Sequence, residues 1–402
     1  MSRRRPYRSY PNDRPRPVSA EGPTTSERTV VEEIAVSTDH WIGGERVAST
    51  ERFEDVSPID EQVIADVARG GSAEARAAVA AARDAFDGWR RTAPKERAEI
   101  LHRIADGVFN VVQGIGEEAG AALTSAPGVA RIAFTGSVDT GRLVARAAAE
   151  HLTPVSLELG GKSPFLIFAD ADPDAALAQA INQFDNAGQV CLAGTRLLID
   201  ERIWDAFIER FTEAAAEIRQ GDPRKETTDL GPLITRAHLD RVEGFVERAK
   251  ADGARLVFGG GVAPELGGLY HRPTLFVDAP AGSEILTKEV FGPVLTAQPF
   301  ANEDEAVSLA NATDFGLAAT VYTSDLARAQ RISERLVAGT VWVNCFFVRD
   351  LNAPFGGSKD SGVGREGGVW SFDFYADVKN TVVAPAQPTR DRPAEGEQEG
   401  RT

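Results

Sequence analysis

The sequence is poor in the residues that stabilise small secreted domains or hold metal ions. Its 402 residues include only two cysteines, Cys191 and Cys345, which excludes a disulfide-based scaffold and leaves two thiols that we expect to be reduced. The five histidines are scattered along the chain and lie at no metal-ligand spacing from either cysteine, so no metal site is predicted.

Long apolar runs and an excess of positive charge are absent as well. No apolar run approaches the ~20 residues of a membrane-spanning helix, and no apolar segment typical of a signal peptide follows the first arginines. A net charge of −16, from 44 basic and 60 acidic residues, argues against nucleic acid as a partner. We therefore expect a cytoplasmic protein that binds neither membranes nor nucleic acid.

What the sequence does contain is an alternation of short β-branched and helical segments between two polar ends. Residues 1–36 and 387–402 show no apolar periodicity and are predicted to be disordered tails. Helices are predicted at 72–86, 94–106, 117–125, 141–151, 204–218 and 237–251, strands at 108–113, 131–135, 155–159, 196–199 and 255–258, and a further α/β block at 306–344. This alternation predicts an α/β fold with parallel sheets covered by helices.

A glycine-containing turn at 134–141, Phe-Thr-Gly-Ser-Val-Asp-Thr-Gly, follows one predicted strand and opens a helix. Backbone N–H groups at the start of a helix favour a phosphate. Gly136 and Ser137 are equally typical of a plain helix cap, so the turn alone leaves both interpretations open.

Two further segments carry reactive side chains. Glu158 ends a predicted strand and is followed by two glycines, so it either faces a ligand crevice or pairs with Lys162 at the edge of a sheet. Cys191 lies in a loop flanked by glycines. A lone cysteine is usually a small buried apolar residue, but this setting also suits an accessible thiolate.

The order and spacing of these segments resemble the aldehyde dehydrogenase superfamily. The turn at 134–141, the segment 158–162 and the segment 188–191 are joined by two more motifs, at 289–294 (Glu-Val-Phe-Gly-Pro-Val) and at 354–366 (beginning Pro-Phe-Gly-Gly-Ser-Lys). The resemblance runs from about Trp41 to Val383. It implies an aldehyde dehydrogenase-like fold with two parallel α/β domains, one of which binds a dinucleotide.

The resemblance implies oxidation of a small-molecule aldehyde to its carboxylic acid with NAD or NADP, of which NAD is favoured, in a homo-oligomer (dimer or tetramer). Cys191 would form a thiohemiacetal and then a thioester, with its backbone N–H donating to the oxyanion. Glu158 would activate the water that hydrolyses the thioester. The implied cofactor contacts are Gly136, Ser137, Gly141 and Leu159 near the pyrophosphate and nicotinamide, Glu289 on the ribose hydroxyls, and Phe291 supporting the ring.

The segment from Val348 to Leu351 resembles the branch that oxidises (carboxymethyl)hydroxymuconic semialdehydes in aromatic catabolism. In that branch an arginine, here Arg349, can hold a substrate carboxylate through a charge-assisted pair. The alternative is that Arg349 is neutralised by Asp350 in a structural turn.

One stretch implied by the resemblance is missing. Full-length members follow the helix at 94–106 with a further helix, a hairpin and two strand–helix units, whereas here Gly107 runs directly into Val108. At ordinary element lengths roughly 90 residues are absent. With them go the asparagine that completes the oxyanion hole and the lysine–proline segment that holds the adenosine ribose.

We therefore predict an incomplete N-terminal and NAD(P)-binding domain at 37–159 with a gap at 107/108, and a catalytic cysteine domain at 160–345. Residues 346–386 are predicted to complete the cofactor domain and to form an oligomerisation arm. Three hypotheses stay open: a working dehydrogenase, a truncated non-catalytic member, and a thiol esterase that uses Cys191 and Glu158 without a cofactor.

Overall fold

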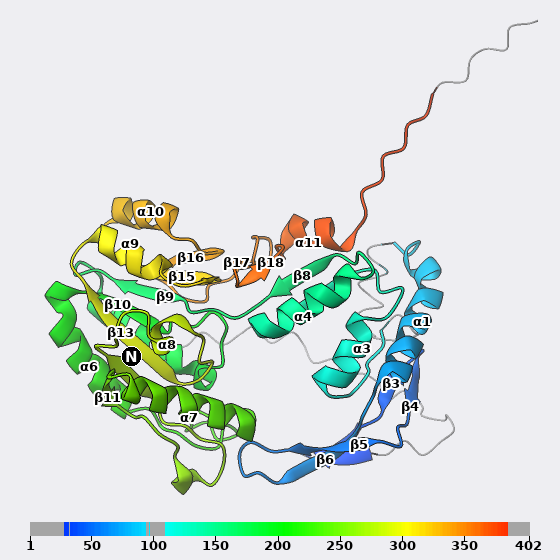
Figure 1. The fold of residues 1–402 in the computed structure, drawn as a ribbon, viewed down its shortest axis with the longest axis horizontal. Helices are drawn as coiled ribbons and strands as arrows, with labels where there is room; N and C mark the ends of the chain where they lie inside the picture. Colours follow the sequence, from blue (N-terminus) through cyan, green and yellow to red (C-terminus); the bar gives the residue numbers. More distant parts are fainter. Residues whose placement is uncertain (1–27, 32, 94–95, 97–108, 385–402) are drawn as a thin grey trace, which may run out of the picture.

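The computed structural model describes residues 28–31, 33–93, 96 and 109–384, which form two α/β lobes on separate sheets (Figure 1). The predicted helix at 94–106, apart from residue 96, and the predicted gap between Gly107 and Val108 lie outside the described residues. Within the described ranges, no helix is long and apolar enough to cross a membrane.

The larger lobe contains a seven-stranded sheet in the order β11-β12-β13-β10-β9-β15-β16. Every neighbouring pair is parallel except β11 and β12, which are antiparallel. The strands are β9 (Pro164–Ile167), β10 (Arg196–Asp200), β11 (Arg255–Phe258), β12 (Thr274–Val277), β13 (Val294–Phe300), β15 (Ala318–Tyr322) and β16 (Thr340–Val343). The strands predicted at 196–199 and 255–258 and the α/β block at 306–344 are confirmed.

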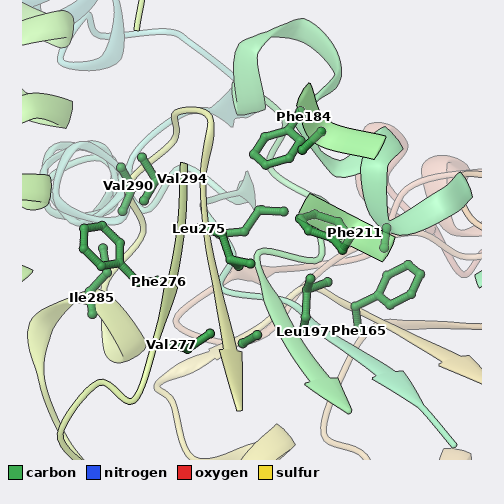
Figure 2. Packing of buried hydrophobic residues seen from close by; sticks show 14 of the residues in the cluster. Phe165, Phe184, Leu197, Phe211, Leu275, Phe276, Val277, Ile285, Val290 and Val294 are labelled. Atoms are coloured by element: carbon green, nitrogen blue, oxygen red, sulfur yellow. The ribbon is translucent and has the colours of Figure 1, made fainter. Parts of the chain in front are cut away.

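Both faces of this sheet are buried, because successive residues of a strand point to opposite faces. On one face Phe165 and Leu197 pack with α5 (Pro173–Ile181), α6 (Trp204–Ala216) and α7 (Arg236–Ala251) (Figure 2). On the other face their neighbours Leu166 and Leu198 pack with α9 (Glu303–Asn311) and α10 (Leu326–Arg335). The predicted helices at 204–218 and 237–251 are confirmed to within two residues.

The smaller sheet has three strands, β7 (Ile132–Thr135), β8 (Val155–Glu158) and β18 (Gly362–Val363), in the order β18-β8-β7. β7 and β8 are parallel, as predicted, and α4 (Val138–Ala149) packs on them through Val144 and Ala148. β18 comes from the far end of the chain and pairs antiparallel with β8. In Figure 1 it lies with β17 (Ser358–Lys359) between the two lobes.

The remaining elements lie before β7. They are the hairpins β3 (His40–Ile42) with β4 (Glu45–Val47) and β5 (Arg52–Val56) with β6 (Val63–Ala68), the helix α1 (Ser72–Trp89), and the consecutive turns η1 (Gly116–Gly120) and α3 (Ala121–Thr124). The helices predicted at 72–86 and 117–125 are thereby confirmed.

The prediction of a disordered tail up to residue 36 is wrong at its end. β1 (Arg28–Val31) and β2 (Ile34–Ser37) form an antiparallel hairpin in which Val31 is paired with Ile34. β-Branched residues in both strands favour this structure. The prolines that dominate the earlier part of the tail do not extend into it.

The prediction of a strand at 108–113 is also wrong. Val111 forms one isolated bridge with Trp41 of β3, through backbone hydrogen bonds of 2.7 and 2.8 Å. None of the described residues 109–113 belongs to a strand. The next N–H along the ladder is taken by a side chain, because Gln113 donates to His40 Nδ1 at 3.0 Å. The segment therefore pairs with the β3–β4 hairpin and not with the smaller sheet.

Candidate active site

β8 ends at Glu158, and the chain leaves the smaller sheet through Leu159 and Gly160. Ser361 fixes this exit: its carbonyl accepts the Leu159 N–H at 2.9 Å, and its hydroxyl donates to the Gly160 carbonyl at 2.7 Å. The same buried hydroxyl oxygen accepts the N–H of Gly316 at 3.0 Å. One side chain thus joins the end of β8 to the larger lobe.

Glu158 is a buried carboxyl group whose ionised form is disfavoured. Its residue is 7% exposed, and neither carboxylate oxygen has a hydrogen-bond partner within the described ranges. Burial and the negative charge of Glu366 raise the pKa of Glu158 to about 7, against the opposing charges of Arg365 and Arg349. A carboxyl group with a pKa near neutrality can both accept and release a proton at physiological pH.

Lys162 does not pair with Glu158, so that alternative is wrong. The Lys162 side chain is 1% exposed, and its Nζ has no hydrogen-bond partner in the part of the chain that the structure describes. Burial and the charge of Arg196 lower the pKa of Lys162 to about 7, while Glu289 acts in the opposite direction. The lysine is electrostatically coupled to Glu289, an interaction that the spacing of the motifs did not indicate.

The paired glycines after Glu158 bring two other predicted site residues close together. The carboxylate of Glu289 accepts the Gly161 N–H at 2.9 Å, and burial raises its pKa. A Cβ on Gly160 would overlap this carboxylate, at 2.7 Å from its Cδ. A Cβ on Gly161 would stand 2.5 Å from the carbonyl oxygen of Cys191. Only glycine permits approaches this close, so both positions require it.

Cys191 follows a tight turn, η2 (Asn182–Gly188), that packs against the loop after Glu289. Gly188 has a φ of +69°, and a Cβ there would overlap the Gly292 carbonyl. Cys191 is half-buried. Burial and the charges of Glu289 and Glu158 raise the pKa of its thiol, while the N–H groups of Cys191 and Leu192 lower it. The resting thiol is therefore protonated, and a nucleophilic attack requires that its proton pass to a base.

The turn before α4 is a helix cap, as one of the two interpretations predicted. Ser137 Oγ accepts the Thr140 N–H at 3.2 Å, and both Gly136 and Ser137 are exposed at the start of the helix. Gly141 is buried, and a Cβ there would stand 2.6 Å from Leu159 Cδ2. α4 thus rests on the residue next to Glu158. Its exposed N-terminus carries the partial positive charge that suits a phosphate.

Arg349 lies near Glu158 and is not neutralised by Asp350. Its guanidinium carbon stands 4.3 Å from the centroid of the Phe355 ring, and its charge lowers the pKa of Glu158. No ion pair joins Arg349 to Asp350 in the described structure, where Asp350 Oδ1 accepts the Asn352 N–H at 2.9 Å. The pairing with Asp350 on which the structural alternative depends is therefore not found in the described structure.

Phe291 lies two residues beyond Glu289, and its ring meets the ring of His238 edge-on, with centroids 6.0 Å apart. His238 and Arg241 of α7 both contact this loop, and sequence reasoning did not single out either one. Among the described residues, no group of three or more His, Cys, Asp or Glu side chains is arranged to hold a metal ion.

The fold and the site define an α/β protein in which a loop thiol, a buried carboxyl group and a second carboxylate gather around two glycines. The model of the aldehyde dehydrogenase family matches this chain over residues 46–107 and 104–381. The chain therefore belongs to the aldehyde dehydrogenase family.

Two relatives describe its position within the family. A betaine aldehyde dehydrogenase of Cereibacter sphaeroides is 47% identical over 291 residues, which cover 71% of this chain and 59% of the relative. A 2-hydroxymuconic semialdehyde dehydrogenase of a Pseudomonas species is 35% identical over an alignment 480 residues long. The alignment covers 86% of this chain and 99% of the relative. The chain thus matches little more than half the length of the first relative.

Among solved structures, the betaine aldehyde dehydrogenase of Staphylococcus aureus in complex with NAD+ superposes with a TM-score of 0.81 at 27% identity. The match covers 84% of this chain and 93% of that one.

Proposed function

We propose that this protein oxidises an aldehyde to its carboxylic acid with NAD(P), using Cys191 as nucleophile and Glu158 as general base. The observation that carries the proposal is the segment from Glu158 to Gly161. It presents a buried carboxyl group with a pKa of about 7 and, within three residues, contacts both the carboxylate of Glu289 and the backbone of Cys191.

The two catalytic residues divide the chemistry between them. The sulfur of Cys191 attacks the aldehyde carbon, and the thiol proton leaves to a base, for which Glu158 has a suitable pKa. The backbone N–H groups of Cys191 and Leu192 lower the pKa of the thiol and so favour negative charge at the sulfur. The Cys191 N–H then donates to the developing oxyanion. Glu158 releases the thiol proton to solvent and then takes a proton from the water that hydrolyses the thioester, a step that breaks the C–S bond and returns Cys191. Bound NAD(P)+ supplies the hydride acceptor.

The residues present fit the nicotinamide half of a dinucleotide. Glu289 is held by Gly161 and offers its second carboxylate oxygen to ribose hydroxyls. Gly136 and Ser137 lie at the exposed N-terminus of α4, where a pyrophosphate is favoured. The structure of the S. aureus relative with NAD+ supports this choice of cofactor.

For the substrate we propose a semialdehyde that carries a carboxylate. Arg349 is exposed, lies near Glu158 and is not paired with Asp350 in the described structure, so its charge is available to a substrate anion. The 2-hydroxymuconic semialdehyde dehydrogenase relative supports this choice. Betaine aldehyde is a cation, and a like charge at Arg349 disfavours it.

We further propose that the cofactor domain comprises residues 37–159 and 346–386, which the pairing of β18 with β8 supports. Two observations favour an impaired enzyme as the second candidate. The two matched segments of the family model meet at 104–107, where the gap is predicted, and the 480-residue match to the semialdehyde relative is longer than this whole chain. Such a protein keeps at most a thiol-esterase activity from Cys191 and Glu158.

One set of assays separates these functions. Purified protein is incubated with NAD+ or NADP+ and three aldehydes: 2-hydroxymuconic semialdehyde, betaine aldehyde and a neutral aliphatic aldehyde. A parallel assay uses an activated ester without cofactor. NADH or NADPH formation is the expected result, fastest with the first aldehyde. Ester hydrolysis without NADH or NADPH formation identifies the thiol esterase. If the protein has a native circular dichroism spectrum and is inactive in both assays, both the dehydrogenase and the esterase proposals are refuted.

A further inference from the structure

Three consecutive backbone carbonyls, those of residues 289, 290 and 291, are held by two side chains of one helix. Arg241 donates to the carbonyl of Glu289 at 2.8 Å and to that of Val290 at 2.6 Å. The His238 ring donates from Nε2 to the carbonyl of Phe291 at 2.7 Å. His238 and Arg241 are three residues apart on α7, so they lie on the same face of the helix.

The carbonyl that His238 holds belongs to a residue in a disfavoured conformation. Phe291 has a φ of +58°, in the left-handed region that side chains with a Cβ avoid. Such a conformation persists only where surrounding contacts determine it. His238 supplies two of these contacts, the hydrogen bond to the carbonyl and the edge-on packing of its ring against Phe291.

The same face of α7 packs on the next residue of the loop. A Cβ on Gly292 would stand 2.8 Å from Val242, and the carbonyl of Gly292 in turn lies against Gly188, three residues before Cys191. α7 itself is well defined at this end, because Thr235 caps it by accepting the His238 N–H at 3.2 Å. The loop at 289–292 therefore lies between α7 and the turn that carries the nucleophile.

We propose that His238 and Arg241 are positioning residues that set the backbone of Glu289, Val290 and Phe291 for the nicotinamide half of the cofactor. This inference rests on the proposed function for the role of the loop. The two residues act through the loop, since their contacts are with its carbonyls and with the Phe291 ring. Preorganising these residues lowers the ordering cost when the nicotinamide half binds.

Substitutions can separate positioning from simple stability. His238→Phe keeps an aromatic ring and removes the donor, whereas His238→Gln restores a donor. Arg241→Met removes both hydrogen bonds to the loop. Arg248→Met is its matched control, because Arg241 and Arg248 stack on the same ring of Phe245, at 5.0 and 4.9 Å, and Arg248 instead pairs with Glu284.

Two measurements are made on the full-length protein. Amide hydrogen exchange of the 288–293 segment is followed without cofactor, and NADH binding is followed by titration. We expect His238→Phe and Arg241→Met to speed exchange of this segment about tenfold and to weaken NADH binding about tenfold. His238→Gln should return both toward wild type, and Arg248→Met should change neither. Where Arg241→Met does not fold, Arg241→Lys takes its place, because it offers one donor nitrogen instead of the two that now reach separate carbonyls.

The outcomes distinguish the two proposals. The positioning role is overturned if His238→Phe and Arg241→Met show the same exchange rate and the same NADH affinity as Arg248→Met. Wild-type protein that binds no NADH counts against the proposed function. In that case exchange at 288–293 alone decides whether the two side chains hold the loop, with faster exchange supporting that role and unchanged exchange overturning it.

Discussion

The carboxylate of Glu289 accepts the backbone N–H of Gly161 at 2.9 Å. This hydrogen bond joins the loop proposed to bind the cofactor to the segment that begins at Glu158. It needs a glycine at position 160, since any Cβ there would occupy the space of the Glu289 carboxylate. The geometry of the base and that of the cofactor loop are therefore linked through one residue that carries no side chain.

The first prediction concerns Gly160→Ala. The added methyl meets the flexible end of the Glu289 side chain, so the carboxylate moves away and releases Gly161 while the fold survives. We expect the free energy of unfolding to fall by about 1–3 kcal/mol or less. NADH affinity should fall about tenfold, or ~1.4 kcal/mol. The control is Gly261→Ala, because a Cβ at Gly261 has no heavy atom within 4 Å. Equal NADH affinity in the two variants would contradict the link.

The second prediction concerns the two thiols, which pack against the same small apolar cluster. Cys191→Ala should abolish both NADH formation and ester hydrolysis, because it removes the nucleophile. Cys345→Ala should leave either activity within about threefold of wild type, since it deletes only a half-buried sulfur, at a cost of roughly 1 kcal/mol. An active Cys191→Ala protein would refute the mechanism.

The third prediction is a pH dependence with opposite signs for activity and stability. Folding raises the pKa of Glu158 from 4.5 to about 7. The folded state therefore binds more protons in this interval than the unfolded state, and stability falls as the pH rises from 4.5 through about 7. Activity should instead rise through about 7, as the base ionises.

Glu158→Gln tests this assignment. Its neutral amide cannot titrate. The free energy of unfolding, measured in denaturant from about pH 5 to about pH 8, should therefore decrease less with rising pH than it does in the wild-type protein. Hydrolysis of the thioester should be lost at every pH. A variant whose stability falls as steeply as that of wild type would assign the pH dependence to another group.

Much of the site could be predicted because its parts are short motifs at fixed positions relative to strands. Glu158 ends a strand of apolar residues, and the pairs of adjacent glycines indicate close backbone approaches, which Gly160 and Gly161 make to Glu289 and Cys191. The larger sheet could be predicted as well, because strands such as β10 carry consecutive apolar residues, here Leu197, Leu198 and Ile199, and a parallel strand buried on both faces needs that pattern.

What could not be predicted depends on contacts between distant segments. Nothing in the sequence near His238 indicates that its ring reaches a carbonyl 53 residues away. The surroundings of Lys162 are equally hard to predict, because the charges that act on its pKa, those of Arg196 and Glu289, lie far away in the sequence. The strand expected at 108–113 failed for the same reason, since its partner is the N-terminal hairpin at Trp41.

The fourth prediction concerns substrate charge. Arg349→Ala should raise KM for a carboxylate-bearing semialdehyde about tenfold more than for a neutral aldehyde of similar size, or ~1.4 kcal/mol. We expect no larger difference in KM because Arg349 is exposed and solvent screens its charge. Arg349→Lys is the matched control: it retains the charge but loses the planar fork, so it should recover part of the difference. Equal changes in KM for both aldehydes would leave Arg349 with no part in substrate recognition.

The last prediction concerns the gap between Gly107 and Val108. A dinucleotide is held at both ends, and the residues proposed to contact it here, Gly136, Ser137, Gly141, Leu159, Glu289 and Phe291, belong to the pyrophosphate and nicotinamide side. We therefore expect NAD+ to bind in the millimolar range or more weakly, which corresponds to about 4 kcal/mol or less. Inserting the missing segment of a full-length relative between Gly107 and Val108 should tighten binding and raise NADH production. Titration calorimetry on the two proteins measures the difference, with Cys191→Ala in the extended chain to separate binding from turnover. Micromolar binding of NAD+ by the chain without the insertion would show that the nicotinamide side suffices, and the working dehydrogenase would then need no further segment.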